Sequence, residues 1–243
     1  MRVLAIIPSR YESSRFPGKP LIDLKGKSMI RRVYEGVNES NKINHTIVAT
    51  DDRRIVDEVK RFGGNVVMTS IHHKNGTGRC IEVAKSLDFY EIVINIQGDE
   101  PLIDIRQIDA LSVAFNDPNV EIATLGIKDV SDEDKRNPNR IKIALDHVNN
   151  ALYFSRSPIP NEHHSDTMVA KSFTFYRHIG VYAYRKTALN KLVMLEPTDL
   201  EKIESLEQLR WMYYGHKIRV VETTIETPNV DVPEDVENVL ALL

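Results

Sequence analysis

The chain opens with an apolar run at residues 3–7 that breaks directly into a loop carrying Arg10, Arg15 and Lys19. The run is too short for a solitary helix, and its unbroken apolar character is typical of a strand buried on both faces, as in a parallel sheet with helices above and below. The loop leaves the carboxyl end of this strand, where open α/β sheets bind their ligands. Three cations on a loop stiffened by prolines predict a polyphosphate site, and a solvated basic turn is the alternative.

Composition narrows the class of protein. The 243 residues suffice for one large α/β domain, and we expect a single domain over 1–243. A formal charge of -3 disfavours a general nucleic-acid binder, which usually carries a dominant basic field. The single cysteine, Cys80, excludes an internal disulfide and fits a reducing compartment, and no apolar run approaches the roughly 20 residues that span a bilayer. We therefore expect a cytoplasmic protein with no nucleic-acid partner and no membrane insertion.

Strands and helices alternate through the first half of the chain. The apolar patterns predict strands at 3–7, 46–49, 65–68 and 92–96 and helices at 29–39, 55–62 and 78–88. Shorter strands follow at 121–126, 140–146, 151–155 and 177–184, and then a helix at 199–214, a strand at 218–223 and a helix from Pro233. The alternation predicts an α/β fold with a mostly parallel sheet flanked by helices, and the later strands predict antiparallel additions in the C-terminal half.

Two acidic residues are candidates for a metal site. Asp99 follows the strand at 92–96 within the segment QGDEP, and Asp231 precedes the final helix. Hard carboxylate oxygens suit Mg²⁺, which binds a few carboxylates together with waters and substrate phosphates. The alternative for each residue is an ordinary capping aspartate at a turn or a helix start.

The segment NGTGR at 75–79 precedes a predicted helix. Its glycines expose backbone N–H groups, the helix N-terminus favours anions, and Arg79 adds a forked donor. The segment is not a Walker loop, because the pattern GxxxxGK[ST] is absent. The segment therefore suggests a contact with an anion but does not identify which anion.

Polar side chains near the later strand ends suit a carboxylated, hydroxyl-rich ligand. Arg156 can grip a carboxylate bidentately, while His178 and Tyr184 can bind hydroxyls. Aromatic core packing with arginines reaching to the surface is the alternative. On the helix predicted at 199–214, Glu204, Glu207 and Gln208 share a face by their spacing, which predicts either a sugar-binding face or a solvated charged face.

The motifs as an ordered set resemble a known family. In chain order they are IIPSRYESSRFPGKPL, VATDD, NGTGR, NIQGDEP, ALYFSRSPIP, YRHIGVYAYR, ESLEQLR and NVDVPEDV. This order is similar to that of 3-deoxy-manno-octulosonate (Kdo) cytidylyltransferases, the CMP-Kdo synthetases of Gram-negative lipopolysaccharide synthesis, from Val3 to the last helix. The resemblance implies a Mg²⁺-dependent nucleotidyltransferase of Rossmann-like α/β architecture, usually a homodimer. Such an enzyme joins the anomeric hydroxyl of Kdo to the α-phosphorus of CTP and releases pyrophosphate.

The same resemblance implies roles for particular residues. Those implied to act in catalysis are Lys19, Arg10 and Asp99, and those implied to bind the nucleotide are Pro8, Arg10, Arg15, Lys19, Thr77, Arg79 and Gln97. The implied sugar-binding residues are Gln97, Arg156, His178, Tyr184, Glu207 and Gln208, and the implied metal ligands are Asp99 and Asp231. Residues 150–185 are expected to contribute to the sugar pocket and to dimer contacts.

Two departures from the family pattern stand out. Gly78 occupies the place of the usual acidic residue in SGT[DE]R, and Asn75 replaces its Ser. The usual Gly before the metal aspartate segment is Asn229, and Asn tolerates left-handed backbone better than most residues.

Three rival functions remain at this stage. The acceptor could be a related acidic sugar, such as the 8-amino analogue of Kdo, because a pocket that binds one substituent can reject another. The chain could be a non-catalytic nucleotide-binding homologue. It could also be a glycosyltransferase, although that class normally takes its metal from a DxD-like pair and Asp99 and Asp231 are far apart in the sequence.

Overall fold

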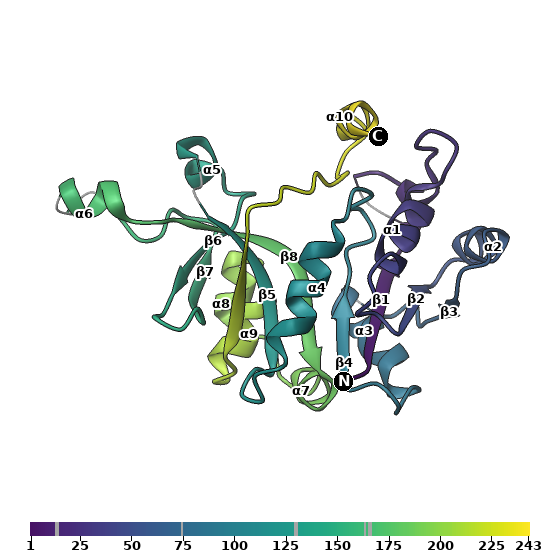
Figure 1. The fold of residues 1–243 in the computed structure, drawn as a ribbon, viewed down its shortest axis with the longest axis horizontal. Helices are drawn as coiled ribbons and strands as arrows, with labels where there is room; N and C mark the ends of the chain where they lie inside the picture. Colours follow the sequence, from purple (N-terminus) through teal and green to yellow (C-terminus); the bar gives the residue numbers. More distant parts are fainter. Residues whose placement is uncertain (13–14, 74, 129–130, 163, 165–166) are drawn as a thin grey trace.

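The computed structural model describes residues 1–12, 15–73, 75–128, 131–162, 164 and 167–243. Its centre is a nine-stranded sheet among these residues, with the order β3-β2-β1-β4-β8-β5-β9 and with β6 and β7 paired beside β8 (Figure 1). The strands are β1 (Val3–Ser9), β2 (His45–Thr50), β3 (Val66–Met68), β4 (Ile92–Asn95), β5 (Ile122–Lys128), β6 (Lys142–Leu145), β7 (Ala151–Ser155), β8 (Tyr176–Arg185) and β9 (Ile218–Thr223). The α-helices are α1 (Met29–Asn38), α2 (Arg53–Arg61), α3 (Gly76–Lys85), α4 (Ile105–Ala114), α5 (Asp132–Arg136), α6 (Thr167–Ser172), α7 (Lys186–Leu192), α8 (Asp199–Glu204), α9 (Gln208–Tyr213) and α10 (Asp235–Leu242), and η1 (Lys19–Leu21) is a 3-10 turn.

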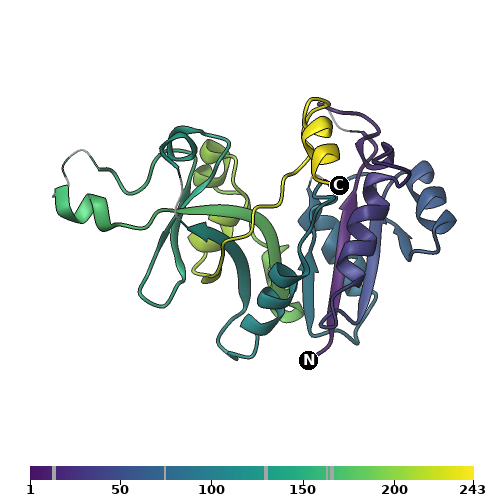
Figure 2. The same cartoon turned by 45° about the horizontal axis from the view of Figure 1, so that its top comes forward.

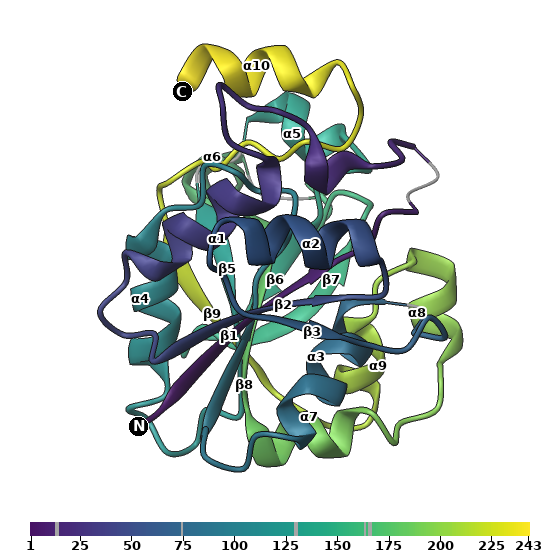
Figure 3. The ribbon, with the colours of Figure 1, turned by 90° about the vertical axis from the view of Figure 1, so that its right-hand side faces the viewer.

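Strand β1 is buried on both faces, as its apolar run predicts. Ala5 and Ile7 belong to the cluster under α1, α2 and α4, whereas Leu4 and Ile6 belong to the cluster under α3, α7 and α9. Figure 3 shows α1, α2 and α4 on one face of the sheet and α3, α7 and α9 on the other. Two apolar layers thus hold β1 in the middle of the molecule and fix the direction in which its last residues leave the sheet.

The strand directions confirm the predicted fold class. β1 pairs in parallel with β2 and β4, and β2 pairs in parallel with β3. β8 then runs antiparallel to β4 on one side and to β5 on the other, and β6 and β7 form an antiparallel hairpin beside it. The parallel half and the antiparallel additions therefore form one continuous sheet.

The last part of the chain returns to the first. After β9, a strap of residues 224–234 crosses the molecule, and α10 follows it over the loop that leaves β1 (Figure 2). Val230 of the strap and Val239 of α10 are buried against Leu24 and Met29. This small apolar cluster holds the strap over the carboxyl ends of β1 and β4.

The prediction of a single helix at 199–214 is wrong, because the structure has two helices there. The structure ends α8 at Glu204 and begins α9 at Gln208, because Ser205 adopts the left-handed conformation with φ 52. Arg210 forms an ion pair with Glu201 across the break. Helices α4, α5, α6 and α7 were not identified from the sequence, although Ile108 and Leu111 of α4 have helical spacing.

Among the described residues, the helices lack the combination of length and apolar character that a bilayer crossing requires.

Candidate active site

The loops after β1 and β4 meet the strap at one edge of the sheet. The Lys19 ammonium donates to Asp99 Oδ2 at 2.8 Å and to the Val230 carbonyl at 2.7 Å, and it lies 3.8 Å from Asp231 Oδ1. Asp231 Oδ1 also accepts from Arg15 at 3.0 Å. Asp99 and Asp231, which are 132 positions apart, therefore flank the same cation.

Backbone geometry explains two glycines of this site. Gly18 has φ 74, and its N–H donates to the Tyr11 carbonyl, which turns the chain so that Lys19 begins η1. At Gly98 an added Cβ would lie 2.8 Å from the Pro8 carbonyl oxygen, so only glycine lets the loop after β4 approach the end of β1 this closely. The Val230 N–H donates to the Asp99 carbonyl at 2.9 Å and ties the strap to the same loop.

A cavity that we call the β1 cavity lies beside Lys19. Its lining includes Pro8, Ser9, Arg10, Arg15, Lys19, Gln97 and Asp99. Arg10 reaches across and donates to the His73 carbonyl. The structure thus brings the three cations predicted from the opening loop to one cavity, and their combined charge favours a polyphosphate there.

Asp99 and Asp231 fit the chemistry of a magnesium site. Both offer hard carboxylate oxygens, and the position between them already stabilises the positive charge of Lys19. The described residues contain no group of three or more His, Cys, Asp or Glu side chains suited to hold a metal ion. A Mg²⁺ at this place would therefore depend on phosphate oxygens and waters for the rest of its coordination.

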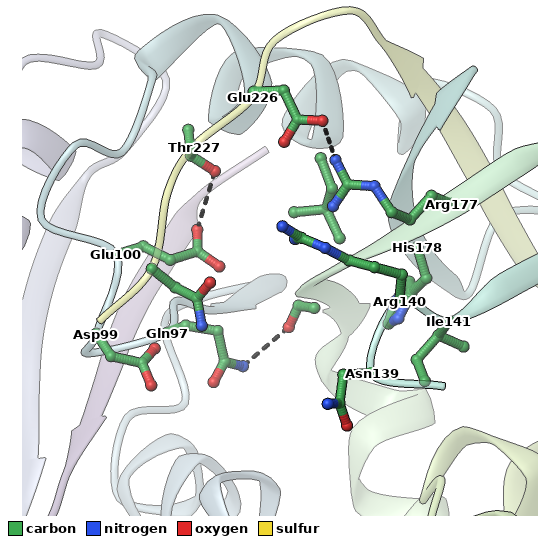
Figure 4. A pocket seen from close by; sticks show the side chains of 13 residues that line it. Gln97, Asp99, Glu100, Asn139, Arg140, Ile141, Arg177, His178, Glu226 and Thr227 are labelled. Carbon is green, nitrogen blue, oxygen red and sulfur yellow. Dashed lines mark hydrogen bonds and ion pairs between the residues drawn. The ribbon is translucent and has the colours of Figure 1, made fainter. Parts of the chain in front are cut away.

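A second cavity, of about 260 Å³, lies between the loop after β4 and strand β8, and we call it the β8 cavity (Figure 4). Gln97 and Asp99 line both it and the β1 cavity. Gln97 Nε2 donates to the Gly180 carbonyl at 2.8 Å, which fixes the amide at the boundary between the two cavities. The two cavities are therefore adjacent regions of one site.

His178 projects from β8 at the wall of the β8 cavity. Its Nε2 lies 2.9 Å from Thr124 Oγ1, and its ring packs against Phe154 and Tyr182. Burial, and secondarily the charge of Arg177, lowers the pKa of His178 to about 3. The imidazole is therefore neutral at physiological pH and can both donate and accept a hydrogen bond.

Several charged residues of the β8 cavity were not singled out from the sequence. The strand predicted at 140–146 included Arg140, which the structure instead places in the turn before β6. Glu226 lies in the irregular strap, and Glu100 was treated only as a neighbour of Asp99. Burial, and secondarily the charge of Asp99, raises the pKa of Glu100 to about 8. The acidic motif QGDEP was the available signal for Glu100.

A third cavity connects these regions, and we call it the bridging cavity. It is lined by Arg15, Asn137, Asn139, Arg140, Arg156, Asn229, Asp231, Val232 and Asp235. Arg156 Nε donates to the Glu204 carbonyl at 2.6 Å and its Nη1 to the Pro138 carbonyl at 2.9 Å. Arg156 therefore lies at the site, with its guanidinium already bound to main-chain carbonyls.

Glu207, which lies between α8 and α9, contacts the segment NGTGR at the start of α3. It accepts hydrogen bonds from Thr77 Oγ1 at 2.7 Å and from Asn75 Nδ2 at 2.8 Å, and burial raises its pKa. Asn75 Oδ1 also accepts from the Gly78 N–H at 2.9 Å, so Asn75 caps α3 in place of the usual Ser. Glu204 instead bonds to Ser155 and Arg156, so the prediction that Glu204 and Glu207 share one helix face is wrong.

Predicted site residues that are buried and line none of the three cavities include Thr77, described above, and Arg79, Tyr184 and Gln208. Arg79 is fully buried, forms an ion pair with Asp51 and donates to Thr69 Oγ1 at 2.7 Å, so it joins the loops after β2 and β3. Tyr184 is fully buried against Trp211, and Gln208 is almost fully buried at the start of α9. The structure separates these buried side chains from the surface on which Lys19, Asp99 and Gln97 converge.

The fold and site define a class of protein, namely an α/β enzyme that gathers cations and paired carboxylates at the carboxyl edge of its sheet for nucleotidyl transfer. A family model described as Cytidylyltransferase matches residues 4–218. The chain is 49% identical over 249 residues to a 3-deoxy-manno-octulosonate cytidylyltransferase of Parabacteroides distasonis, covering 100% of this chain and 98% of the relative. It is 50% identical over 247 residues to one of Porphyromonas gingivalis, covering 99% and 96%. The chain belongs to the 3-deoxy-manno-octulosonate cytidylyltransferase family and is a nucleotidyltransferase.

A solved structure supports this assignment. The structure of a CMP:2-keto-3-deoxy-manno-octonic acid synthetase complexed with CTP superposes with a TM-score of 0.94 at 40% identity, covering 100% of this chain and 98% of that one. A 4-diphosphocytidyl-2C-methyl-D-erythritol synthase from Anaerococcus prevotii superposes with a TM-score of 0.64 at 15% identity, covering 99% and 97%. The second likeness shows the shared fold alone.

Proposed function

We propose that the chain transfers CMP from CTP to the anomeric hydroxyl of Kdo, giving CMP-Kdo and pyrophosphate with Mg²⁺ as cofactor. The observation that carries the proposal is the convergence of Lys19, Asp99 and Asp231 beside a cavity lined by Arg10 and Arg15. The full-length relatives named for this reaction support the choice of nucleotide and acceptor.

The proposed mechanism depends on positioning and on charge neutralisation. Phosphoryl-group chemistry needs little covalent participation by the protein, provided that developing negative charge is stabilised. Arg10, Arg15 and Lys19 would hold the triphosphate and stabilise the departing pyrophosphate. Mg²⁺ held by Asp99 and Asp231 would supply charge neutralisation at the α-phosphate and favour ionisation of the attacking hydroxyl.

The acceptor would occupy the β8 cavity, which adjoins the β1 cavity through Gln97 and Asp99. Gln97 and His178 offer neutral hydrogen-bonding groups that suit sugar hydroxyls. A transferred nucleotidyl group would therefore pass from one cavity to its neighbour across Asp99.

One assay tests the proposal directly. The purified protein is incubated with Mg²⁺, each of the four nucleoside triphosphates and a panel of ulosonic acids, and pyrophosphate is followed. Release that requires both CTP and Kdo is the expected result. Preference for the 8-amino sugar would change the acceptor and retain the reaction, whereas the absence of release with every pair would contradict the proposal.

A further inference from the structure

The acceptor proposed above is an acid, so its site needs a cation that is free to bind a carboxylate. Two arginines line the β8 cavity, Arg140 and Arg177. Arg177 is buried and forms an ion pair with Glu226, so its charge is already balanced within the protein (Figure 4). Binding a second carboxylate at Arg177 would require breaking this pair.

The neighbouring cations are also occupied. Lys19 is shared between Asp99, the Val230 carbonyl and Asp231, and Arg15 is bound to Asp231. Arg156 donates to three main-chain carbonyls, including that of Ser205 at 3.4 Å. Each of its three guanidinium nitrogens therefore already has a partner. These groups suit the triphosphate or the local fold better than the carboxylate of an acceptor.

Arg140 differs from all of them. Its guanidinium points into the β8 cavity from the turn before β6 (Figure 4). Its side-chain partner in the described part of the chain is Asp134, whose Oδ1 lies 3.4 Å from Nε, and the side chain is 45% exposed. The same arginine lines the bridging cavity together with Asp231.

We propose that Arg140 binds the carboxylate of the acidic sugar acceptor and so determines specificity for ulosonic acids; the inference rests on the proposed function. In the cyclic hemiketal form of a 2-keto acid the carboxylate is attached to the anomeric carbon, which bears the reacting hydroxyl. A bidentate pair with Arg140 therefore orients that hydroxyl toward the Asp99–Asp231 edge of the site. The acceptor takes the place of solvent at the Nη groups, while the Nε contact with Asp134 can remain.

Kinetics with varied acceptor test this role. Arg140→Ala is expected to raise the KM for Kdo on the order of 10- to 100-fold, the loss typical of one charge-assisted hydrogen-bonded pair, with the KM for CTP unchanged. Arg140→Lys, which keeps the charge without the planar fork, is expected to restore part of the loss. A KM for Kdo that stays at the wild-type value in Arg140→Ala, in an enzyme that turns over, overturns the inference and leaves the proposed function intact.

Asp134→Asn is the matched control. It removes the ion pair and keeps Arg140, so the KM for Kdo is expected to stay at or below the wild-type value. If Asp134→Asn instead reproduces the effect of Arg140→Ala, the arginine acts by holding the turn before β6 and the inference is wrong.

A modified acceptor completes the experiment. The Kdo methyl ester lacks the carboxylate charge, so wild-type enzyme is expected to discriminate against it by about the factor lost in Arg140→Ala, and that variant is expected to treat ester and acid alike. Equal discrimination by both enzymes would place the carboxylate elsewhere. Absence of turnover by wild-type enzyme with all acceptors would overturn the proposed function and this inference with it.

Discussion

Lys19 lies between Asp99 and Asp231, so each carboxylate can be replaced singly while the other stays beside the lysine. Asp99→Asn keeps the shape of the side chain but removes a charge that the proposed cofactor site needs. We expect kcat to fall on the order of 10²-fold or more with the free energy of unfolding little changed. Pyrophosphate release and denaturant unfolding measure the two quantities.

The exposed Asp57 of α2 provides the matched control for this substitution. Asp57→Asn is expected to retain wild-type turnover. Normal turnover by a folded Asp99→Asn variant would refute the metal role of Asp99.

Gly78 shows how a position inside the family motif can depend on a side chain just outside it. An added Cβ at Gly78 would lie 2.9 Å from Nδ1 of His73, whose ring is held by Glu82. Alanine is usually better than glycine in a helix by about 0.5–1 kcal/mol. In the wild-type protein we expect Gly78→Ala not to increase the free energy of unfolding, because the His73 ring occupies the space that the methyl group needs.

A double-mutant cycle measures this coupling through the free energy of unfolding. In a His73→Ala background, Gly78→Ala is expected to stabilise the protein by about 0.5–1 kcal/mol. Additive effects of the two substitutions would show that His73 does not constrain position 78.

At the scale of elements, the local patterns predicted the parallel half of the sheet well. The apolar run of β1 and the helical spacing of α1 and α2 reflect contacts made close by in the sequence. The insertion of β8 between β4 and β5 depends on pairing between segments far apart in the chain, which no local pattern encodes. The helix break at Ser205 was missed because a serine in the left-handed conformation has no distinctive composition.

The difference between local patterns and contacts between distant segments also decides which site residues could be predicted. Arg10, Lys19 and Asp99 follow strands whose carboxyl ends meet, so their convergence could be predicted. Residue type alone could not show that Arg79 and Tyr184 lie in the interior, since burial depends on the packing of whole layers. Arg140 was not singled out because the sequence does not show which neighbouring cations are already paired.

His178 gives strand β8 a characteristic pH dependence. Its pKa in the folded protein is about 3, below the ordinary value of 6.5, so the unfolded chain takes up the proton first as the pH falls. The stabilisation is complete above about pH 6.5 and is lost progressively toward pH 3, and it amounts to about 1–2 kcal/mol at pH 5.

His178→Gln can keep a hydrogen bond to Thr124 and cannot titrate. We expect its free energy of unfolding to decline less steeply than that of wild type between pH 7 and pH 4.5, measured by urea titration at each pH. Parallel pH profiles for the two proteins would contradict a neutral imidazole with a lowered pKa in the folded protein.

At the scale of the whole molecule, α6 and the hairpin of β6 and β7 extend away from the rest of the sheet (Figure 1). Leu152, Met168, Val169 and Phe173 are exposed apolar side chains in this region, and residues 150–185 are the segment expected to make dimer contacts. Burial of such side chains between two copies would stabilise a dimer.

We expect sedimentation velocity to show a wild-type dimer that Met168→Glu shifts toward monomer. Met194→Glu, at a methionine of similar exposure after α7, is the control and is expected to leave the dimer unchanged. A wild-type protein that sediments as a monomer, or equal effects of the two substitutions, would exclude this surface as the dimer contact.

The strap of residues 224–234 has a consequence for how the protein is made. Arg10, Lys19 and Asp99 leave the ribosome early, whereas Asp231 is synthesised only after every strand of the sheet. A nascent chain or a fragment ending at β9 can hold the cations without the second carboxylate and without the Val230 carbonyl that orients Lys19. Under the proposed role of Asp231, nucleotidyl transfer is restricted to molecules whose translation has run past the last strand.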